Sequence, residues 1–287
     1  MKNIIGILLT FFSLYCTADI VDQGPVSLNG TVSHVMYSEK IQQHFLIDIF
    51  LPQGYQEKKS EYQFPKYPVI YVLNSRPNAV MLATMRNFAQ MNREIIVGIG
   101  YADEKGKPSH SFAAYTRDLT PNKDEHWMGA KTAGTGGGAK NFLDFINTQV
   151  KPFINKTYTV NKHNQTLVGH SFAGLFGLYT LFTQPDSFDR YVIASPSLWW
   201  GNGIGFELEK HYASTNTNLS KKLFLAVGGA ELNTAPEHML DNTQLIFEKL
   251  QQRKYPNLEL SYKVFEDATH QSVVADALNK GVEAVFQ

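Results

Sequence analysis

Short apolar runs and longer amphipathic stretches alternate along this chain, and this alternation is its strongest constraint on fold. The runs are rich in Val, Ile, Leu, Phe and Tyr and lie at 44–52, 67–74, 93–100, 165–171, 190–197, 221–229 and 258–267. Most are apolar on both faces, as in buried strands of a parallel sheet. Helices are predicted at 78–91, 139–158, 235–255 and 271–286 from three- and four-residue apolar spacing. The pattern predicts an α/β fold with a mostly parallel central sheet flanked by helices.

Two places interrupt this rhythm. Pro152 lies inside the predicted helix 139–158 and is expected to kink or end it. Residues 101–138 are polar and contain the glycine run 136–138, so they predict a long irregular excursion. No internal repeat or linker divides the chain, and we expect one domain over residues 19–287.

The N-terminal segment has the pattern of a secretory signal peptide. Lys2 precedes the uncharged run IIGILLTFFSLY, and the small residues that follow predict cleavage after Ala18. A membrane-anchoring helix is the alternative, and a lipoprotein would use Cys16. Cys16 is the only cysteine in the chain, so cleavage would leave neither a disulfide nor a thiol nucleophile. We expect an exported, periplasmic protein with no stable membrane insertion.

Charge and composition narrow the possible partners. Lys plus Arg number 26 and Asp plus Glu number 26, so the formal net charge is zero, which argues against nucleic acid as the main partner. The glycine run lacks the Gly-Lys-Ser/Thr ending of a phosphate-binding loop. No His, Asp or Glu set has convincing metal spacing. We expect no metal or other cofactor, and the sequence does not indicate an oligomeric state.

The segment TLVGHSFAGLFGLY places Ser171 between a strand-like run and a helix-like run. This is the context of a nucleophile elbow, in which small neighbours keep the strained serine turn free of clashes. The second glycine is displaced by one position, because Ala173 stands where it is usual and Gly174 follows. A glycine-rich turn with a solvated serine is the alternative.

Chain order adds support for the elbow, because this fold places an acid and then a histidine downstream of the serine. His270 follows the last strand-like run and precedes the terminal helix. Glu231 is the first carboxylate after the run 221–229 and is the predicted acid. Asp267, or a Ser–His dyad without a strong acid, are the alternatives.

The predicted chemistry requires donors for a tetrahedral oxyanion as well as a base for the serine hydroxyl. One donor is expected to be the backbone N–H of Phe172. The second is expected from the segment 74–76, with Ser75 as the candidate.

These segments together resemble the putative-esterase family of α/β-hydrolases, which includes bacterial siderophore esterases and is related to S-formylglutathione hydrolases. The likeness runs from about Ser33 onward and is strongest in the elbow, in SPSLWW (195–200) and in RDLTP (117–121). The resemblance implies Ser171 as nucleophile and His270 as base. Glu231 stands where an acid of the family can lie, although some relatives rely on a dyad.

Three further residues are candidates for substrate contact. Trp199 and Trp200 follow a strand end and could line an aromatic wall, or pack in the core. Arg117 could meet an anionic or carbonyl-rich substrate, or pair with Asp118.

The sequence thus predicts an exported serine esterase that cleaves a small-molecule carboxylic ester through an acyl-enzyme. A siderophore-type lactone and a small acyl ester are the candidate substrates. Acyl transfer to an alcohol is one alternative. A binding protein that kept the fold without turnover is another.

Overall fold

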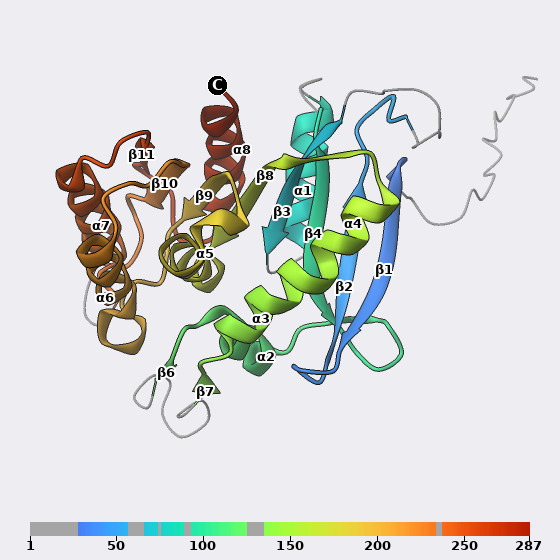
Figure 1. Ribbon diagram of the computed structural model, residues 1–287, viewed down its shortest axis with the longest axis horizontal. Coiled ribbons are helices and arrows are strands. Elements are labelled where there is room, and N and C mark those ends of the chain that lie inside the picture. Colours follow the sequence, from blue (N-terminus) through green and yellow to red (C-terminus); the bar gives the residue numbers. More distant parts are fainter. Residues whose placement is uncertain (1–27, 57–65, 74–75, 89–92, 125–134, 234–236) are drawn as a thin grey trace, which may run out of the picture.

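The apolar runs of the sequence form the strands of one central sheet (Figure 1). The computed structural model describes residues 28–56, 66–73, 76–88, 93–124, 135–233 and 237–287. Within these residues the strand order is β1 (Thr31–Ser38), β2 (Gln43–Phe50), β4 (Ile95–Ala102), β3 (Tyr67–Leu73), β8 (Val160–His170), β9 (Arg190–Ala194), β10 (Lys222–Gly228) and β11 (Glu259–Phe265). β1, β2 and β4 pair antiparallel, and every pair from β4 to β11 is parallel. The predicted α/β fold is confirmed. β1, an edge strand that is exposed along most of its length, was not predicted.

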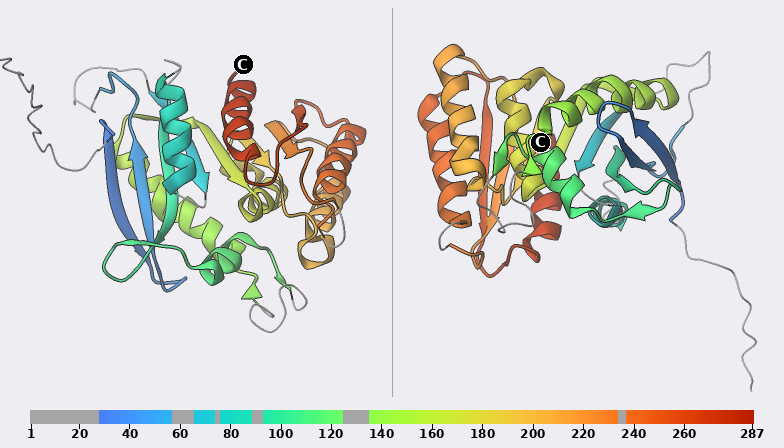
Figure 2. Two further views of the ribbon diagram at one scale, coloured as in Figure 1. Left: turned by 180° about the vertical axis from the view of Figure 1, so that it is seen from behind. Right: turned by 90° about the horizontal axis from the view of Figure 1, so that it is seen from below.

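Helices cover both faces of the sheet. Two of them, α1 (Arg76–Phe88) and α8 (Val273–Phe286), lie on the face seen in the left view of Figure 2. The opposite face carries α2 (Phe112–Leu119), α3 (Ala139–Phe145), α4 (Lys151–Thr157), α5 (Phe172–Thr183), α6 (Trp200–Thr215) and α7 (Met239–Arg253).

Strand β3 contributes side chains to the apolar cores on both faces of the sheet. Val69, Tyr71 and Leu73 belong to the core under α2–α7. Ile70 and Val72 belong to the core under α1 and α8. Side chains alternate across a strand, so a strand buried on both faces must be apolar at every position.

The segment 101–138 is more ordered than the sequence predicts. It completes β4 and contains β5 (Pro108–Ser109), α2, and the short pair β6 (Lys123–Asp124) and β7 (Thr135–Gly136). The prediction of an irregular excursion is therefore wrong for this part, while residues 125–134 lie outside the described chain. The sequence pattern for α2 is weak because this helix is only eight residues long. Its start depends on a cap, in which Ser111 Oγ accepts the N–H of Ala114.

Pro152 does not end its helix. A π-helical turn, η2 (Ile146–Val150), joins α3 to α4, and Pro152 lies in the first turn of α4. A proline lacks an N–H and its ring needs space beside the preceding turn. The wider π turn before it provides that space.

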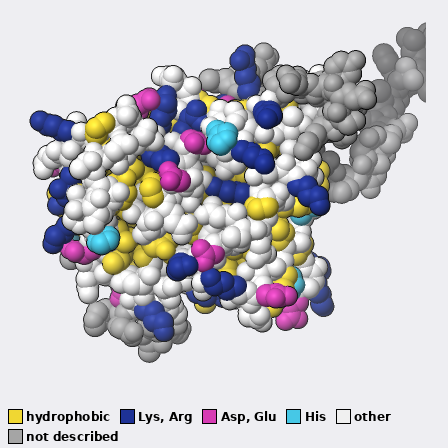
Figure 3. Space-filling view, in the orientation of Figure 1, with side chains coloured by type: hydrophobic (Ala, Val, Ile, Leu, Met, Phe, Trp, Pro, Cys, Tyr) yellow, Lys and Arg dark blue, Asp and Glu magenta, His cyan; other side chains and the backbone are white. Residues whose placement is uncertain are grey.

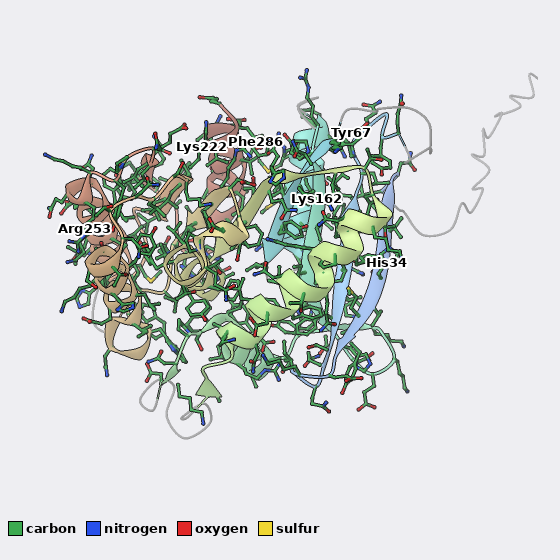
Figure 4. All side chains as sticks on the ribbon, viewed as in Figure 1. His34, Tyr67, Lys162, Lys222, Arg253 and Phe286 are labelled. Atoms are coloured by element: carbon green, nitrogen blue, oxygen red, sulfur yellow. The ribbon has the colours of Figure 1, made fainter. Side chains whose placement is uncertain are left out.

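Polar contacts link the outer elements, among them contacts of His34 and Arg253, which Figure 4 labels. His34 on β1 lies 3.3 Å from the Tyr158 hydroxyl. Arg253 at the end of α7 pairs with Glu209 of α6, with Nε 2.7 Å from Oε1. The first contact ties the edge strand β1 to the end of α4, and the second ties α7 to α6.

The surface has mixed charge. Lys and Arg side chains are interspersed with Asp and Glu over the described part of the face in Figure 3, as the balanced composition predicts. No helix in the described chain combines the length and the apolar character needed to cross a bilayer.

Helix α8 approaches the sheet closely at Gly281. A Cβ at this position would lie 2.3 Å from Cγ1 of Val192 and 2.8 Å from Cδ1 of Phe224. We predict that Gly281→Ala lowers the free energy of unfolding by about 1–3 kcal/mol, because overpacking outweighs the helix propensity of alanine. Urea denaturation measures this. Lys280→Ala, on the exposed side of the same helix, is the control, and equal stability of all three proteins would contradict the prediction.

Candidate active site

Ser171 occupies a sharp turn between β8 and α5. Its backbone has φ 61° and ψ −123°, a strained region for a residue with a side chain. The strand ends at His170 and the helix begins at Phe172. This strand–turn–helix geometry raises the serine side chain above the carboxyl end of the sheet, as a nucleophile elbow does.

Close backbone approaches explain both glycines of the turn. A Cβ on Gly169 would lie 2.2 Å from the carbonyl oxygen of Ala173. A Cβ on Gly174 would lie 3.0 Å from the carbonyl oxygen of Ala194, at the end of β9. Ala173 is itself fully buried. The displaced second glycine is therefore the one that the neighbouring strand requires.

The loop after β10 and the turn after β11 are joined by backbone hydrogen bonds. The N–H of Gly229 donates to the carbonyl of Phe265 at 2.8 Å, and the N–H of Ala230 donates to that of Ala268 at 3.0 Å. A Cβ on Gly229 would lie 2.3 Å from the Glu266 carbonyl oxygen, so glycine permits this approach. The two segments that carry Glu231 and His270 are thereby held side by side.

Ser171, His270 and Glu231 form a hydrogen-bonded line. Nε2 of His270 lies 3.0 Å from Oγ of Ser171, and Nδ1 lies 2.7 Å from Oε2 of Glu231. The three residues come from the turns after β8, β11 and β10. Asp267, the alternative acid, is exposed to solvent.

The carboxylate of Glu231 is buried yet well supplied with donors. Its side chain is 0% exposed. Oε1 accepts the N–H of Gly228 at 2.7 Å and the hydroxyl of Ser195. Burial raises the pKa of Glu231, but the hydrogen bonds from His270, Ser195 and Gly228 outweigh it and leave the pKa below its usual value. The carboxylate is therefore charged at neutral pH.

His170 stacks on the ring of His270. The ring centroids are 4.4 Å apart. Burial, with a smaller contribution from the charge of His270, lowers the pKa of His170 to about 3. A neutral ring at this place supports the imidazole of His270 without adding a positive charge beside it.

The neutral His170 predicts an acid-sensitive fold. Below pH ~6.5 the unfolded chain gains a proton on this histidine that the folded chain binds only near pH 3. The free energy of unfolding therefore falls as the pH falls through this window. Between pH 7 and pH 4, the wild type should lose about 3 kcal/mol more than His170→Phe. Urea denaturation at several pH values measures this, and parallel curves for the two proteins would refute it.

A cavity of about 510 Å³ opens over Ser171 and His270. Aromatic rings form much of its wall, namely Phe112, Tyr115, Phe172 and Trp199. An apolar cavity with a few convergent polar groups is typical of a small-molecule site. The structure thus brings Trp199 to the site, as one of the two sequence-based alternatives predicted.

The structure places Trp200 and Arg117 in the alternatives to substrate contact that the sequence left open. Trp200 is fully buried, and its Nε1–H donates to the carbonyl of Asn122 at 3.0 Å, so it packs in the core. Arg117 forms two hydrogen bonds with Asp118, at 2.7 and 2.8 Å, and does not line the cavity. Trp199 and Trp200 thus have different surroundings although they are adjacent in sequence. Arg117 is bound to Asp118 because a buried carboxylate requires a charged partner.

The structure describes only one of the two predicted oxyanion donors, the backbone N–H of Phe172. Phe172 begins α5, where the backbone N–H groups of a first helical turn have no partner within the helix. Asn74 and Ser75, which include the predicted second donor, lie outside the described residues. In the part of the chain that is described, no group of three His, Cys, Asp or Glu side chains could hold a metal ion.

Three residues at the site were not predicted as functional. Tyr115 and His170 line the cavity, and Ser195 hydrogen-bonds Glu231. His170 adjoins Ser171 in sequence, and Ser195 lies in the strand-like run 190–197, so both positions were available as sequence signals. Tyr115 lies in the segment that was predicted to be irregular, so no periodic pattern pointed to it.

Comparisons with known proteins relate this chain to esterases. The model of the family described as Putative esterase matches residues 38–273. The chain is 28% identical over 219 residues to ferri-bacillibactin esterase BesA of Bacillus subtilis, covering 72% of this chain and 75% of that protein. It is 36% identical over 167 residues to a siderophore triacetylfusarinine C esterase of Aspergillus fumigatus, covering 55% and 53%. The crystal structure of the BES protein from Bacillus cereus has a TM-score of 0.74 at 30% identity, covering 93% of this chain and 99% of that one.

Proposed function

This chain belongs to the Putative esterase family and is a serine ester hydrolase, and we propose that it works through an acyl-enzyme on Ser171. In this proposal His270 is the general base and Glu231 the acid of a triad. The observation that carries it is the line of hydrogen bonds from Ser171 through His270 to Glu231.

The reaction follows from the protonation states along this line. A charged Glu231 accepts the N–H at Nδ1 of His270, which leaves the Nε2 lone pair facing the Ser171 hydroxyl. Nε2 takes the serine proton as Oγ attacks the ester carbonyl. The imidazolium then returns the proton to the leaving alcohol. Water then attacks the acyl-enzyme with the same help from His270, which releases the carboxylic acid and restores the Ser171 hydroxyl.

The developing oxyanion requires donors near Ser171. The backbone N–H of Phe172 is one, because the residue after the nucleophile supplies a donor in this fold. Ser75 remains the proposed source of the second backbone donor. Each such donor contributes on the order of 10²-fold or more to the rate.

The proposed substrate is a siderophore-type lactone, with a small acyl ester as the second candidate. Relatives described as esterases of ferri-bacillibactin and triacetylfusarinine C support the first. The aromatic wall of the 510 Å³ cavity suits an acyl or aryl arm of either substrate.

A substrate panel combined with covalent trapping tests the proposal. p-Nitrophenyl acetate, butyrate and octanoate are compared with a cyclic catecholate trilactone and a cyclic hydroxamate triester, each with and without ferric iron. We expect hydrolysis of at least one class and a fluorophosphonate adduct that peptide mapping assigns to Ser171. New esters formed with an added alcohol would indicate acyl transfer instead. Absence of both turnover and adduct would overturn the proposed mechanism.

We also propose that the protein is exported after cleavage behind Ala18. The charged start, apolar run and small residues of the first 18 positions support this. Cell fractionation followed by N-terminal sequencing should find the mature protein in the periplasm, beginning at Asp19. A chain that keeps Met1 in the cytoplasmic fraction would contradict export.

A further inference from the structure

The side chain of Tyr115 reaches into the nucleophile turn from helix α2. Its ring packs against Phe172, with the centroids 5.5 Å apart. The phenol oxygen faces the side chain of Ser171 and the backbone N–H groups of Phe172 and Ala173, and these three neighbours act to lower the pKa of the phenol. Tyr115, Ser171 and Phe172 all line the same cavity. The phenol is therefore in direct contact with the reacting group of the proposed mechanism.

The position of this hydroxyl coincides with the place that an ester carbonyl oxygen needs. When Ser171 attacks, that oxygen must lie close to Oγ and accept the N–H of Phe172. The phenol oxygen now faces both of these groups. In the free enzyme the phenol oxygen of Tyr115 therefore lies where the substrate oxygen would bind.

The proton of the phenol is available for donation. The N–H groups of Phe172 and Ala173 can only donate to the phenol oxygen, so Ser171 Oγ is the acceptor among these neighbours for the single O–H proton. Burial raises the pKa of Tyr115 to about 12, although these three neighbours lower it in part. The hydroxyl therefore keeps its proton at neutral pH.

Helix α2 holds the tyrosine at this place. The Tyr101 hydroxyl donates to the carbonyl of Ala114 at 3.3 Å. At the other end of the helix, the N–H of Gly138 donates to the carbonyl of Arg117 at 2.8 Å. The backbone on either side of Tyr115 is thus anchored, and a movement of the phenol is a side-chain rotation.

We propose that Tyr115 is a catalytic residue that donates its hydroxyl hydrogen bond to the oxyanion. The ester oxygen replaces the phenol as acceptor of the Phe172 and Ala173 N–H groups. The phenol moves aside by about one hydrogen-bond length, ~3 Å, and turns its O–H from Ser171 to the incoming oxygen. No covalent bond to Tyr115 forms or breaks. This inference rests on the proposed acyl-enzyme mechanism at Ser171.

Tyr115→Phe tests the inference, because it removes only the hydroxyl. We expect kcat to fall by about 10²-fold to 10³-fold, as on loss of one oxyanion donor, with KM changed by less than about threefold. Affinity for an aliphatic trifluoromethyl ketone, which forms a tetrahedral adduct with serine, should fall by a similar factor. Rates are normalised to sites titrated to completion with a fluorophosphonate, so that misfolded protein does not count.

Tyr212→Phe, on helix α6, is the matched control. It removes a hydroxyl that donates to the carbonyl of Asn218 at 2.7 Å, outside the catalytic cavity, so kcat and ketone affinity should stay within about twofold of the wild type. Thermal denaturation of both variants reports any loss of structure. A merely structural role of Tyr115 would lower stability without separating kcat from KM.

Two outcomes would overturn the inference. An unchanged kcat and ketone affinity in Tyr115→Phe would exclude donation to the oxyanion. A higher kcat/KM, or tighter ketone binding, would mean that the phenol only blocks the site. Failure of the acyl-enzyme proposal is distinguishable from both, since the wild type itself would then form no fluorophosphonate adduct.

Discussion

Replacing Ser171 by alanine is expected to lower kcat/KM for ester hydrolysis by about 10⁴-fold to 10⁶-fold, the range found when a nucleophile of this type is removed. The oxygen that lies 3.0 Å from His270 Nε2 is the only heavy atom lost. The oxyanion donors and the cavity remain, so a small residual rate is expected. Fluorophosphonate labelling should disappear together with the activity.

The serine variant should be as stable as the wild type or more so. Alanine at position 171 removes a side-chain oxygen from a strained turn, and it leaves the backbone contacts of β8 and α5 in place. Ser214→Ala, on the exposed side of α6, serves as the control with unchanged rate. A Ser171→Ala protein that retains more than a tenth of the activity would place the nucleophile elsewhere.

Glu231→Gln is expected to lower kcat by about 10³-fold to 10⁴-fold. The amide keeps the size of the side chain but removes the charge that stabilises the imidazolium of His270. Its NH₂ group would also face either the His270 Nδ1–H or the donors Gly228 N–H and Ser195 Oγ–H, which now meet carboxylate oxygens. The rate loss, measured with the best of the tested esters, separates a triad from a dyad.

Asp267→Asn is the matched control for this experiment. Asp267 lies on the same turn as His270, three residues away, but is exposed, so its neutral variant should keep kcat within about twofold. A near-wild-type rate for Glu231→Gln would show that the site works as a Ser–His dyad. A large loss in Asp267→Asn alone would assign the acid to that residue.

Sequence pattern was sufficient for the sheet and for the strand–turn–helix geometry at Ser171. Apolar runs of strand length, helical stretches between them, and glycines around Ser171 are local signals, because each acts within one element or one turn. The mostly parallel order followed from their alternation. The fold prediction failed where the local signal is short, as in α2, whose eight residues depend on the cap at Ser111.

The choice between Glu231 and Asp267 was not a local matter. In sequence, Asp267 is three residues from His270 and Glu231 is 39 residues away. Parallel pairing of β10 with β11 brings the loop of Glu231 against the turn of His270. The burial of Glu231 and its three donors then result from that pairing.

The sequence alone determined the elements, their order and the chemical type of the groups at the strand ends. Only the tertiary structure decided which of two adjacent tryptophans faces the cavity, that Arg117 is bound to Asp118, and that Tyr115 reaches Ser171. Backbone pattern depends on neighbours a few residues apart. The direction and partner of a side chain depend on packing between segments that are distant in the chain, and that packing is not encoded in any single stretch of it.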